Sequence, residues 1–392
     1  MLNRLVFAET KELARILGND NIRFVGGCVR DLIAEQPISD IDFATVFTPE
    51  QVIYHCGKHD IRVIPTGIQH GTVTVIIGSY QFQVTTLRRD VSTDGRRAVV
   101  EYVDDWEADA SRRDFTINAF YLSIDGKLTD FFGGMDHLRS NKIVFIGNAE
   151  ERIKEDYLRI LRYFRFSGKF GGGNAPDDGL ARLFSRYSAH INYLSGERLH
   201  SEMFKILCLD NAPQTLAHMQ NCGVLHFIFP GDVSFDILRN LIAIEDKPNP
   251  IRRLAAIEGY DVKALCEHWK LSGEHTKTLK AIKSDDIAME DPKIIMRHLG
   301  KDRFRDIAYL EAARGRLPYE LHEVLEFATQ WKIPNFPIYG HDVMALGLKE
   351  GRKIGQILSK LEVYWEQHGF LLSREELLKR LRILVEEAQV DE

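Results

Sequence analysis

Three short motifs follow one another in a fixed order near the start of this 392-residue chain. They are GGCVRD at residues 26–31, SDIDF at 39–43 and RRDFTINAF at 112–120. The first supplies a glycine pair, the second an Asp-x-Asp pair, and the third arginines next to an aspartate. Each residue type has its own task in binding phosphate or a metal ion. The three motifs together therefore constrain the fold and the chemistry more than any one of them does.

The Asp-x-Asp pair predicts a metal site. Residues 40–43 alternate polar and apolar side chains, which is typical of a strand, and side chains two apart leave the same face of a strand. Asp40 and Asp42 can then reach one cation, and Mg²⁺ prefers carboxylate and phosphate oxygens. An isolated pair is more often a turn residue followed by a solvated strand position, because aspartate favours turns. The context of the pair therefore decides its interpretation.

That context is an apolar strand at 22–25, which runs into Gly26 and Gly27. Without a Cβ atom, glycine lets the backbone approach a phosphate closely. The segment 29–35 is predicted to begin a helix, and free N–H groups at a helix start favour an anion. Arg30 adds a guanidinium group that suits phosphate oxygens. The pattern predicts that a nucleoside triphosphate binds beside the metal site.

Together, these residues resemble the head of the class II tRNA nucleotidyltransferases (CCA-adding enzymes) and of the bacterial poly(A) polymerases. The likeness continues into DFFGGMD at 130–136, IKEDYLRILRYFRF at 153–166 and SGERLHSEMFKIL at 195–207. The segment 340–358 is also similar to the C-terminal region of the family. The resemblance implies an α+β fold, in which a nucleotidyltransferase head with a mixed β-sheet and flanking helices precedes an all-α neck, body and tail.

The sequence pattern agrees with this organisation. Short strand patterns mix with helical ones up to about residue 145, and the pattern is helical from about 150 onward. The strand candidates include 72–77, 81–86, 98–102 and 116–124. We expect a nucleotidyltransferase head at 1–145, a neck for base recognition at 146–210, a helical body at 211–333 and a tRNA-binding tail at 334–392.

The neck segment 153–166 is predicted to form one amphipathic helix, with Asp156 and Arg159 opposite its apolar face. The plain interpretation is a solvated face with an ion pair between these two residues. In the family that the chain resembles, the matching residues choose the base without a nucleic-acid template. The carboxylate accepts from the amino group of cytosine or adenine, and the arginine donates to the ring nitrogen. Uracil and guanine present the opposite order and are rejected.

The resemblance also implies the remaining site residues. Catalysis and metal binding are assigned to Asp40 and Asp42, with Mg²⁺ as the cofactor. Nucleotide binding is assigned to Gly27, Arg30, Arg113, Asp156, Arg159, Arg162 and Arg165. Asp114 and Asn118 are candidates to reach the ribose or to order their own strand.

Two further segments bear on the activity. Residues 88–100 resemble the flexible loop that full CCA-adding enzymes use and that CC-only relatives lack, although a surface hairpin would have a similar sequence. Gln83 occupies a position where several relatives have a glutamate next to the catalytic strand. We expect activity to survive this change, because phosphate oxygens and waters can complete a Mg²⁺ shell.

Composition limits the partners. The formal net charge is −6, so binding of RNA must depend on local basic residues such as Lys349, Arg352 and Lys353 in the tail. The five cysteines have no CxxC spacing and fit reduced thiols. No apolar run approaches the length of a membrane span. We expect a cytoplasmic protein, and the sequence leaves the oligomeric state open.

We therefore expect addition of C, C and A to the 3′ end of tRNA from CTP and ATP, with release of pyrophosphate, by two-metal nucleotidyl transfer. The alternatives are a poly(A) polymerase on the same scaffold, a CC-only or A-only enzyme, and a non-catalytic RNA-binding relative. PTGIQHGTVTV at 65–75 is more similar to the strand of CCA-adding enzymes than to the arginine-rich one of the polymerases. Intact Asp40, Asp42 and Arg30 argue against the non-catalytic relative.

Overall fold

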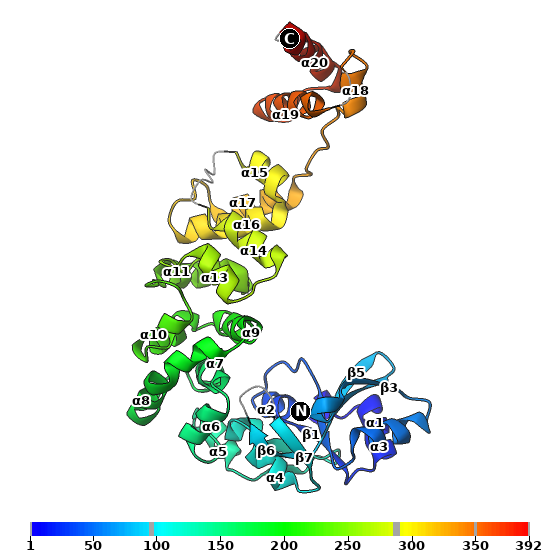
Figure 1. Ribbon diagram of the computed structural model, residues 1–392, viewed down its shortest axis with the longest axis vertical. Coiled ribbons are helices and arrows are strands. Elements are labelled where there is room, and N and C mark those ends of the chain that lie inside the picture. Colours follow the sequence, from blue (N-terminus) through cyan, green and yellow to red (C-terminus); the bar gives the residue numbers. More distant parts are fainter. Residues whose placement is uncertain (1, 94–97, 285–290, 349–350, 391–392) are drawn as a thin grey trace. The chain divides into compact units, whose positions relative to one another are not determined.

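The computed structural model of the protein describes residues 2–93, 98–284, 291–348 and 351–390. It divides into two compact units. The first comprises Met1–Ser234, Pro248–Pro250 and Gly259–Ser272, and the second comprises Phe235–Lys247, Ile251–Glu258 and Gly273–Glu392. Within the described residues, all strands belong to the first unit and the second unit is helical (Figure 1). The predicted α+β fold class is confirmed.

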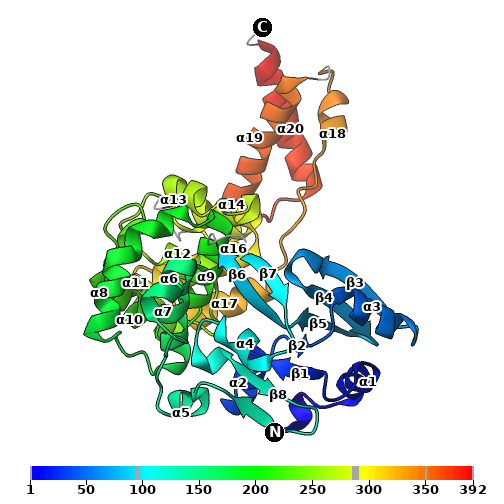
Figure 2. The same ribbon diagram turned by 60° about the horizontal axis from the view of Figure 1, so that its bottom comes forward.

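A seven-stranded mixed sheet forms the centre of the head, with the strand order β3-β4-β5-β2-β1-β8-β9. Its strands are β1 (Ile22–Val25), β2 (Asp42–Thr45), β3 (Arg62–Gly67), β4 (Thr72–Ile77), β5 (Tyr80–Thr86), β8 (Phe120–Leu122) and β9 (Leu128–Asp130). Strand β2 runs parallel to β5, whereas the other neighbouring pairs are antiparallel. Figure 2 shows β1 between β2 and β8. Strands β6 (Arg88–Thr93) and β7 (Ala98–Tyr102) form a separate hairpin.

The two faces of this sheet differ because successive side chains of a strand alternate. Phe24, Phe43 and Phe82 are buried on one face, with ring centroids 4.5 Å apart for the first pair and 5.7 Å for the second. Asp42 precedes Phe43 and lies on the other face, where it is in register with Gln83 of β5. The aromatic face belongs to the core, and the face with Asp42 carries the candidate site.

Short helices connect the strands of the head. The α-helices are α1 (Ala8–Leu17), α2 (Gly27–Ile33), α3 (Pro49–Gly57), α4 (Trp106–Ser111) and α5 (Gly134–Arg139), and the 3₁₀ turns are η1 (Leu2–Arg4), η2 (Ile68–His70) and η3 (Thr116–Asn118). The expected strand at 116–124 is wrong in its first half, which forms η3. Asn118 Nδ2 donates to Asp114 Oδ1 at 3.0 Å, and such local side-chain bonds compete with strand pairing.

The remaining helices of the first unit follow the sheet region. They are α6 (Ala149–Glu155), α7 (Leu158–Phe170), α8 (Asp178–Tyr187), α9 (Gly196–Leu207), α10 (Ala212–Asn221) and α13 (Val262–His268), with 3₁₀ turns η4 (Ser188–Tyr193) and η5 (Leu225–Phe227). The prediction of one helix over 153–166 is wrong, because the backbone of Asp156 is extended (φ −157°, ψ 106°). Its Oδ1 accepts from Leu158 N at 3.1 Å, so the aspartate caps the second helix.

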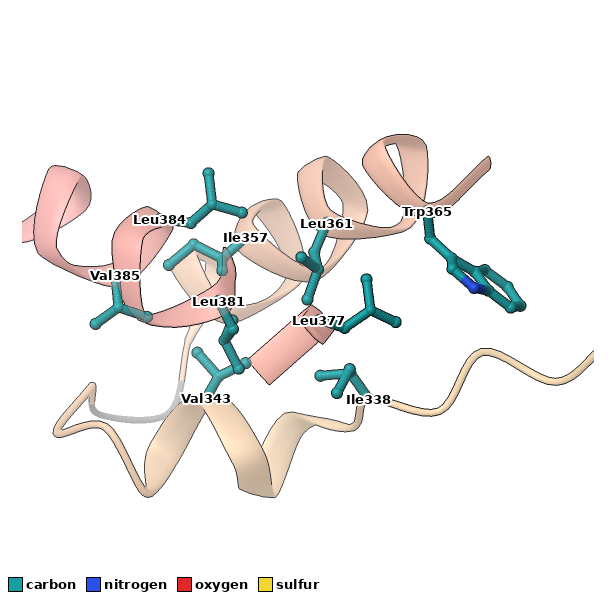
Figure 3. Packing of buried hydrophobic residues seen from close by; sticks show 9 residues of the cluster. All are labelled: Ile338, Val343, Ile357, Leu361, Trp365, Leu377, Leu381, Leu384 and Val385. Atoms are coloured by element: carbon teal, nitrogen blue, oxygen red, sulfur yellow. The ribbon is translucent and has the colours of Figure 1, made fainter. Parts of the chain in front are cut away.

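The second unit is built from the helices α11 (Asp236–Ile244), α12 (Pro250–Ala255), α14 (Gly273–Ile282), α15 (Pro292–Leu299), α16 (Lys301–Ala313), α17 (Leu321–Gln330), α18 (Gly340–Met344), α19 (Arg352–Gln367) and α20 (Arg374–Val390). The last three enclose a core of their own, in which Leu361 and Trp365 of α19 pack with Leu377 and Leu381 of α20 (Figure 3). None of the described helices is both long and apolar enough to cross a membrane.

Candidate nucleotide-binding and metal site

The glycine pair forms the turn between β1 and α2. Gly26 has φ +71°, a conformation that L side chains rarely adopt, and its N–H donates to Phe120 O at 3.0 Å. A Cβ at this position would lie 3.4 Å from Arg113 Nη1. Glycine therefore allows the turn and leaves room for the Arg113 guanidinium against the backbone. Gly27 begins α2, in which Arg30 is buried.

A pocket of about 430 Å³ opens at this turn. It is lined by Gly26, Gly27, Arg30, Arg112, Arg113, Asp114, Asn118, Asp156, Arg159, Arg162, Arg165 and Phe166. All seven residues that were predicted to bind the nucleotide are among them. The lining carries six arginines and two aspartates, so its charge suits a polyanion such as a triphosphate.

Carboxylates hold several of these arginines in place. The half-exposed Arg162 donates from Nε to Asp114 Oδ2 at 2.7 Å, and Arg165 Nε lies 2.6 Å from Oε2 of the buried Glu202 of α9. Although burial disfavours the charge of Asp114, Arg162 and the Asn118 amide hold the pKa of this carboxyl below its ordinary value. Asp114 is therefore an ionised anchor for the arginine. This contact joins the segment between α4 and β8 to α7.

Arg30 is fixed in a different way. Its guanidinium donates to Asp31 Oδ1 at 2.9 and 3.0 Å and to the side-chain oxygen of Asn118. It also lies over the rings of Phe166 and Phe170, at 5.0 and 4.5 Å from the centroids. Asn118 therefore orders Arg30 as well as its own turn, which explains its place in the pocket wall.

The predicted base-reading pair lies in this pocket, but the two side chains do not bind each other. Asp156 Oδ2 accepts from Arg198 Nη2 at 2.7 Å, and Arg159 Nη1 donates to Glu155 Oε2 at 2.6 Å. The plain interpretation of a local ion pair between them is therefore wrong. Arg159 Nη2 also donates to the carbonyl of Arg112 at 3.4 Å. Each side chain keeps hydrogen-bonding capacity, since a carboxylate has about four acceptor sites and a guanidinium has five N–H donors.

Asp40 and Asp42 do not line the pocket. Asp40 is exposed in the loop before β2, where its Oδ2 accepts from Ser39 Oγ at 2.9 Å, so the predicted strand begins two residues later than expected. Burial raises the pKa of Asp42 above its ordinary value, the negative charge of Asp40 raises it further, and Arg113 opposes both. Asp42 therefore lies within electrostatic reach of Asp40 and of Arg113, which does line the pocket.

The two carboxylates fit a divalent cation. Within the described part of the chain, no ion pair and no side-chain hydrogen bond is formed by the Asp42 carboxylate, and its like-charged neighbour destabilises its ionised form. A hard cation between the two would reverse that repulsion, and Mg²⁺ binds through one or two carboxylates and substrate phosphates. The described residues contain no group of three or more His, Cys, Asp or Glu side chains arranged for a metal. Asp40 and Asp42 are thus the candidate metal site among the described residues.

Comparisons with known proteins identify the family. Residues 22–144 match the model of the poly A polymerase head domain, and residues 177–232 match that of a probable RNA and SrmB binding site of polymerase A. The human mitochondrial CCA tRNA nucleotidyltransferase 1 is 34% identical over 384 residues, which cover 93% of this chain and 87% of that protein. The chain belongs to the class II CCA-adding enzyme family.

Other family members agree with this assignment. The CCA-adding enzyme of Oceanobacillus iheyensis is 46% identical over 185 residues, which are 47% of this chain and 45% of that enzyme. The crystal structure of the Bacillus stearothermophilus CCA-adding enzyme in complex with CTP superimposes with a TM-score of 0.80 at 25% identity and covers 98% of both chains. The α+β fold is therefore that of this family over nearly the whole chain.

Three partners in this site of the family fold were missed by sequence reasoning. They are Asp109, which binds Arg112 and Arg113, Arg198, which binds Asp156, and Glu202, which binds Arg165. Arg198 and Glu202 lie within the segment 195–207, which resembles the family, so this motif points to them. Asp109 precedes the arginine motif by three residues and had no signal except its helical spacing.

Proposed function

We propose that the chain adds C, C and A to the 3′ end of tRNA without a nucleic-acid template, using CTP and ATP and releasing pyrophosphate. The observation that carries this proposal is that one pocket is lined by Gly27, Asp156 and six arginines. One of these arginines, Arg113, lies within electrostatic reach of Asp42. The relationship to the human CCA tRNA nucleotidyltransferase supports tRNA as the acceptor.

In this proposal the arginines bind the triphosphate. Arg30 and Arg113 lie at the glycine turn, where the backbone allows a phosphate to approach, and Arg162 and Arg165 extend the positive surface along α7. Their carboxylate partners hold them in place before the nucleotide arrives, which lowers the cost of ordering them on binding. The arginines also stabilise the charge on the departing pyrophosphate.

Asp156 and Arg159 select the base. The Asp156 carboxylate accepts from the exocyclic amino group of cytosine or adenine, and Arg159 donates to the neighbouring ring nitrogen. The bond from Arg198 keeps the Asp156 carboxylate oriented. Uracil and guanine would place an acceptor opposite the carboxylate and a donor opposite the arginine.

Asp40 and Asp42 hold Mg²⁺ in this proposal. When bound there, Mg²⁺ supplies Lewis-acid stabilisation of the 3′-oxygen of the RNA and of the departing phosphates. The ionised form of Asp42 is needed for that task, and Arg113 assists it by opposing the rise in the pKa of Asp42.

A poly(A) polymerase is the second candidate, because the head matches a poly A polymerase model. Incubation with tRNA that lacks its terminal CCA, all four nucleoside triphosphates and Mg²⁺, followed by sequencing of the 3′ ends, separates the candidates. We expect additions that end at CCA. Runs of A would support the polymerase, a stop after CC or addition of A only to tRNA-CC would indicate a divided activity, and unextended ends would overturn the proposal.

A cytoplasmic location stays a prediction from the sequence. The human and mouse relatives are named mitochondrial, so membership of the family is compatible with more than one compartment. Fractionation of cells followed by detection of the protein decides this point.

A further inference from the structure

Asp109 of α4 is a buried carboxylate that binds two pocket-lining residues, Arg112 and Arg113, but does not itself line the pocket. The residue is 1% exposed. Its Oδ1 accepts from Arg112 Nη2 at 2.8 Å, and its Oδ2 accepts from Arg113 Nη2 at 2.8 Å and from the Tyr121 hydroxyl at 2.6 Å. Although burial opposes its charge, Arg113 and Arg112 hold the pKa of Asp109 well below its ordinary range. An ionised carboxylate therefore binds both arginines at once.

Local structure explains this arrangement. Asp105 caps α4 by accepting from Glu107 N at 2.9 Å, and the helix ends at Ser111. Asp109, Arg112 and Arg113 stand at positions i, i+3 and i+4, which meet on one face of a helical turn. Ala110 packs in a cluster with Val25, Ala44 and Tyr121, which fixes the helix against the sheet face that carries Asp42.

The same carboxylate reaches the root of the β6–β7 hairpin. The backbone N–H of Arg88, the first residue of β6, donates to Asp109 Oδ1 at 3.2 Å. In return, Arg112 Nε donates to the backbone carbonyl of Arg88 at 3.0 Å. Asp109 and Arg112 thus bind both the N–H and the carbonyl of Arg88 at the start of the hairpin.

Both arginines extend from these contacts into the site. Arg113 lies against Gly26 and within electrostatic reach of Asp42. The carbonyl of Arg112 accepts from the base-selecting Arg159. Asp109 therefore contacts two arginines that lead to different parts of the site. Arg113 leads to the glycine turn and Asp42, and Arg112 leads to Arg159 of α7.

We propose that Asp109 is a positioning residue of the nucleotide pocket, which orients Arg112 and Arg113 for the triphosphate and ties them to the root of the β6–β7 hairpin. It acts through the arginines and does not touch the nucleotide. The proposal deepens the nucleotidyltransferase function and rests on it.

The test compares Asp109→Asn with Glu107→Gln, which removes the same charge from an exposed position of the same helix. For Asp109→Asn we expect the KM for CTP and for ATP to rise about tenfold, the size of one lost charge-assisted hydrogen bond, with a smaller change in kcat. Glu107→Gln should leave both parameters unchanged. An unaltered KM in folded Asp109→Asn would overturn the proposal.

Binding of inorganic tripolyphosphate gives a second readout that is independent of turnover. Loss of a negative charge by itself would tighten the binding of this anion, whereas loss of arginine position weakens it. We expect weaker binding to Asp109→Asn and parent-like binding to Glu107→Gln, measured by calorimetry. Tighter binding to Asp109→Asn would contradict a positioning role.

Two further variants distinguish a loss of folding from a loss of nucleotide binding. If Asp109→Asn does not fold, Tyr121→Phe decides. It keeps the ring and removes the hydroxyl that donates to Asp109 Oδ2 and accepts from Arg113 Nε at 3.3 Å. An unchanged KM for Tyr121→Phe overturns the proposal. In an Arg113→Ala background, Asp109→Asn should raise KM by less than it does in the parent, because only its action through Arg112 remains. An undiminished effect would contradict action through Arg113. Failure of the parent protein to add CCA would instead overturn the proposed function, whatever the tripolyphosphate result.

Discussion

In the proposed function, Asp42 combines a catalytic role with a cost to the stability of the fold. It stands at the first position of β2, half-buried, beside the like-charged Asp40, and burial is the largest cause that raises its pKa. An ionised carboxylate in this setting is less stable than the same group in water. In our proposal, a bound Mg²⁺ offsets this cost. Residues that serve function in this way oppose stability.

We expect Asp42→Asn to lose at least about a hundred- to a thousand-fold in nucleotide incorporation, the range found when one electrostatic stabiliser of a transition state is removed. Binding of tRNA should persist, because the pair serves the metal rather than the RNA. Asp104→Asn, at an exposed position of the head, serves as the control. Substantial Mg²⁺-dependent incorporation by Asp42→Asn, or the parallel Asp40→Asn, would contradict the metal assignment.

The same substitution has a pH signature in the absence of metal. The folded-state pKa of Asp42 lies above its ordinary value of 3.8, so the folded protein binds this proton more tightly than the unfolded chain does. The stability that this group contributes is therefore present at low pH and is lost as pH rises through the folded pKa. Asp42→Asn should match the parent at low pH and become the more stable protein above that window. Urea unfolding in EDTA across pH 3–7 measures the free energy of unfolding of both proteins. A stability of Asp42→Asn that falls below that of the parent as pH rises would refute the expectation.

Gln83 is in register with Asp42 on the neighbouring parallel strand, as the sequence interpretation required, and its side chain is exposed. Gln83→Glu therefore adds a carboxylate on the same face as the metal pair. We expect the variant to remain active and to need less Mg²⁺ for half-maximal rate. Gln81→Glu, two residues before Gln83 in β5, is the matched control. Identical Mg²⁺ titrations for both variants would mean that Gln83 does not face the metals.

At the scale of elements, the sequence predicts what local chemistry determines. The strands at 72–77 and 98–102 and the glycine turn agree with the structure because their signals lie within the segments themselves. The break at Asp156 was not predictable in this way, since the apolar spacing of the segment continues across it. The partners of the arginines were missed for another reason. Asp156 and Arg198 lie 42 residues apart, and only packing of α9 against α7 joins them.

A glycine-to-alanine substitution should change the stability of the protein in opposite directions at two helical positions, because only one of them is closely packed. A Cβ on Gly168 of α7 would lie 2.5 Å from Leu209 Cδ1 and 2.7 Å from Thr215 Oγ1, so Gly168→Ala should destabilise the protein by about 1–3 kcal/mol. Gly355 of α19 has open space around its Cβ position, and Gly355→Ala should stabilise its helix by about 0.5–1 kcal/mol. Calorimetry of each variant and hydrogen exchange of the substituted helix measure the two stability changes. Two changes of the same sign would contradict this account of the packing.

At the scale of the whole molecule, the nucleotide pocket belongs entirely to the first unit. The second unit has separate cores, including that of α18, α19 and α20. Of the predicted tRNA contacts in the tail, Arg352 and Lys353 are exposed at the start of α19, whereas Lys349 lies outside the described residues. The division into head, neck, body and tail stays a prediction, as does the contact of the tail with tRNA.

In the proposed function, protein side chains select the base without a nucleic-acid template. The most direct test of this selection is the fidelity of Asp156→Ala, measured by incorporation of UTP and GTP against CTP and ATP on tRNA that lacks CCA. Loss of the acceptor should reduce discrimination about five- to a hundred-fold, the equivalent of roughly 1–3 kcal/mol. Asp177→Ala is the matched control, because Asp177 caps α8 through Leu180 N at 2.9 Å and lies outside the pocket wall.

If Asp156 only caps α7, both variants should lose a little stability and keep the fidelity of the parent. We expect that Asp156→Ala misincorporates U and G, whereas Asp177→Ala continues to add only C and A. Unaltered fidelity in a folded and active Asp156→Ala would contradict the claim that this residue reads the base.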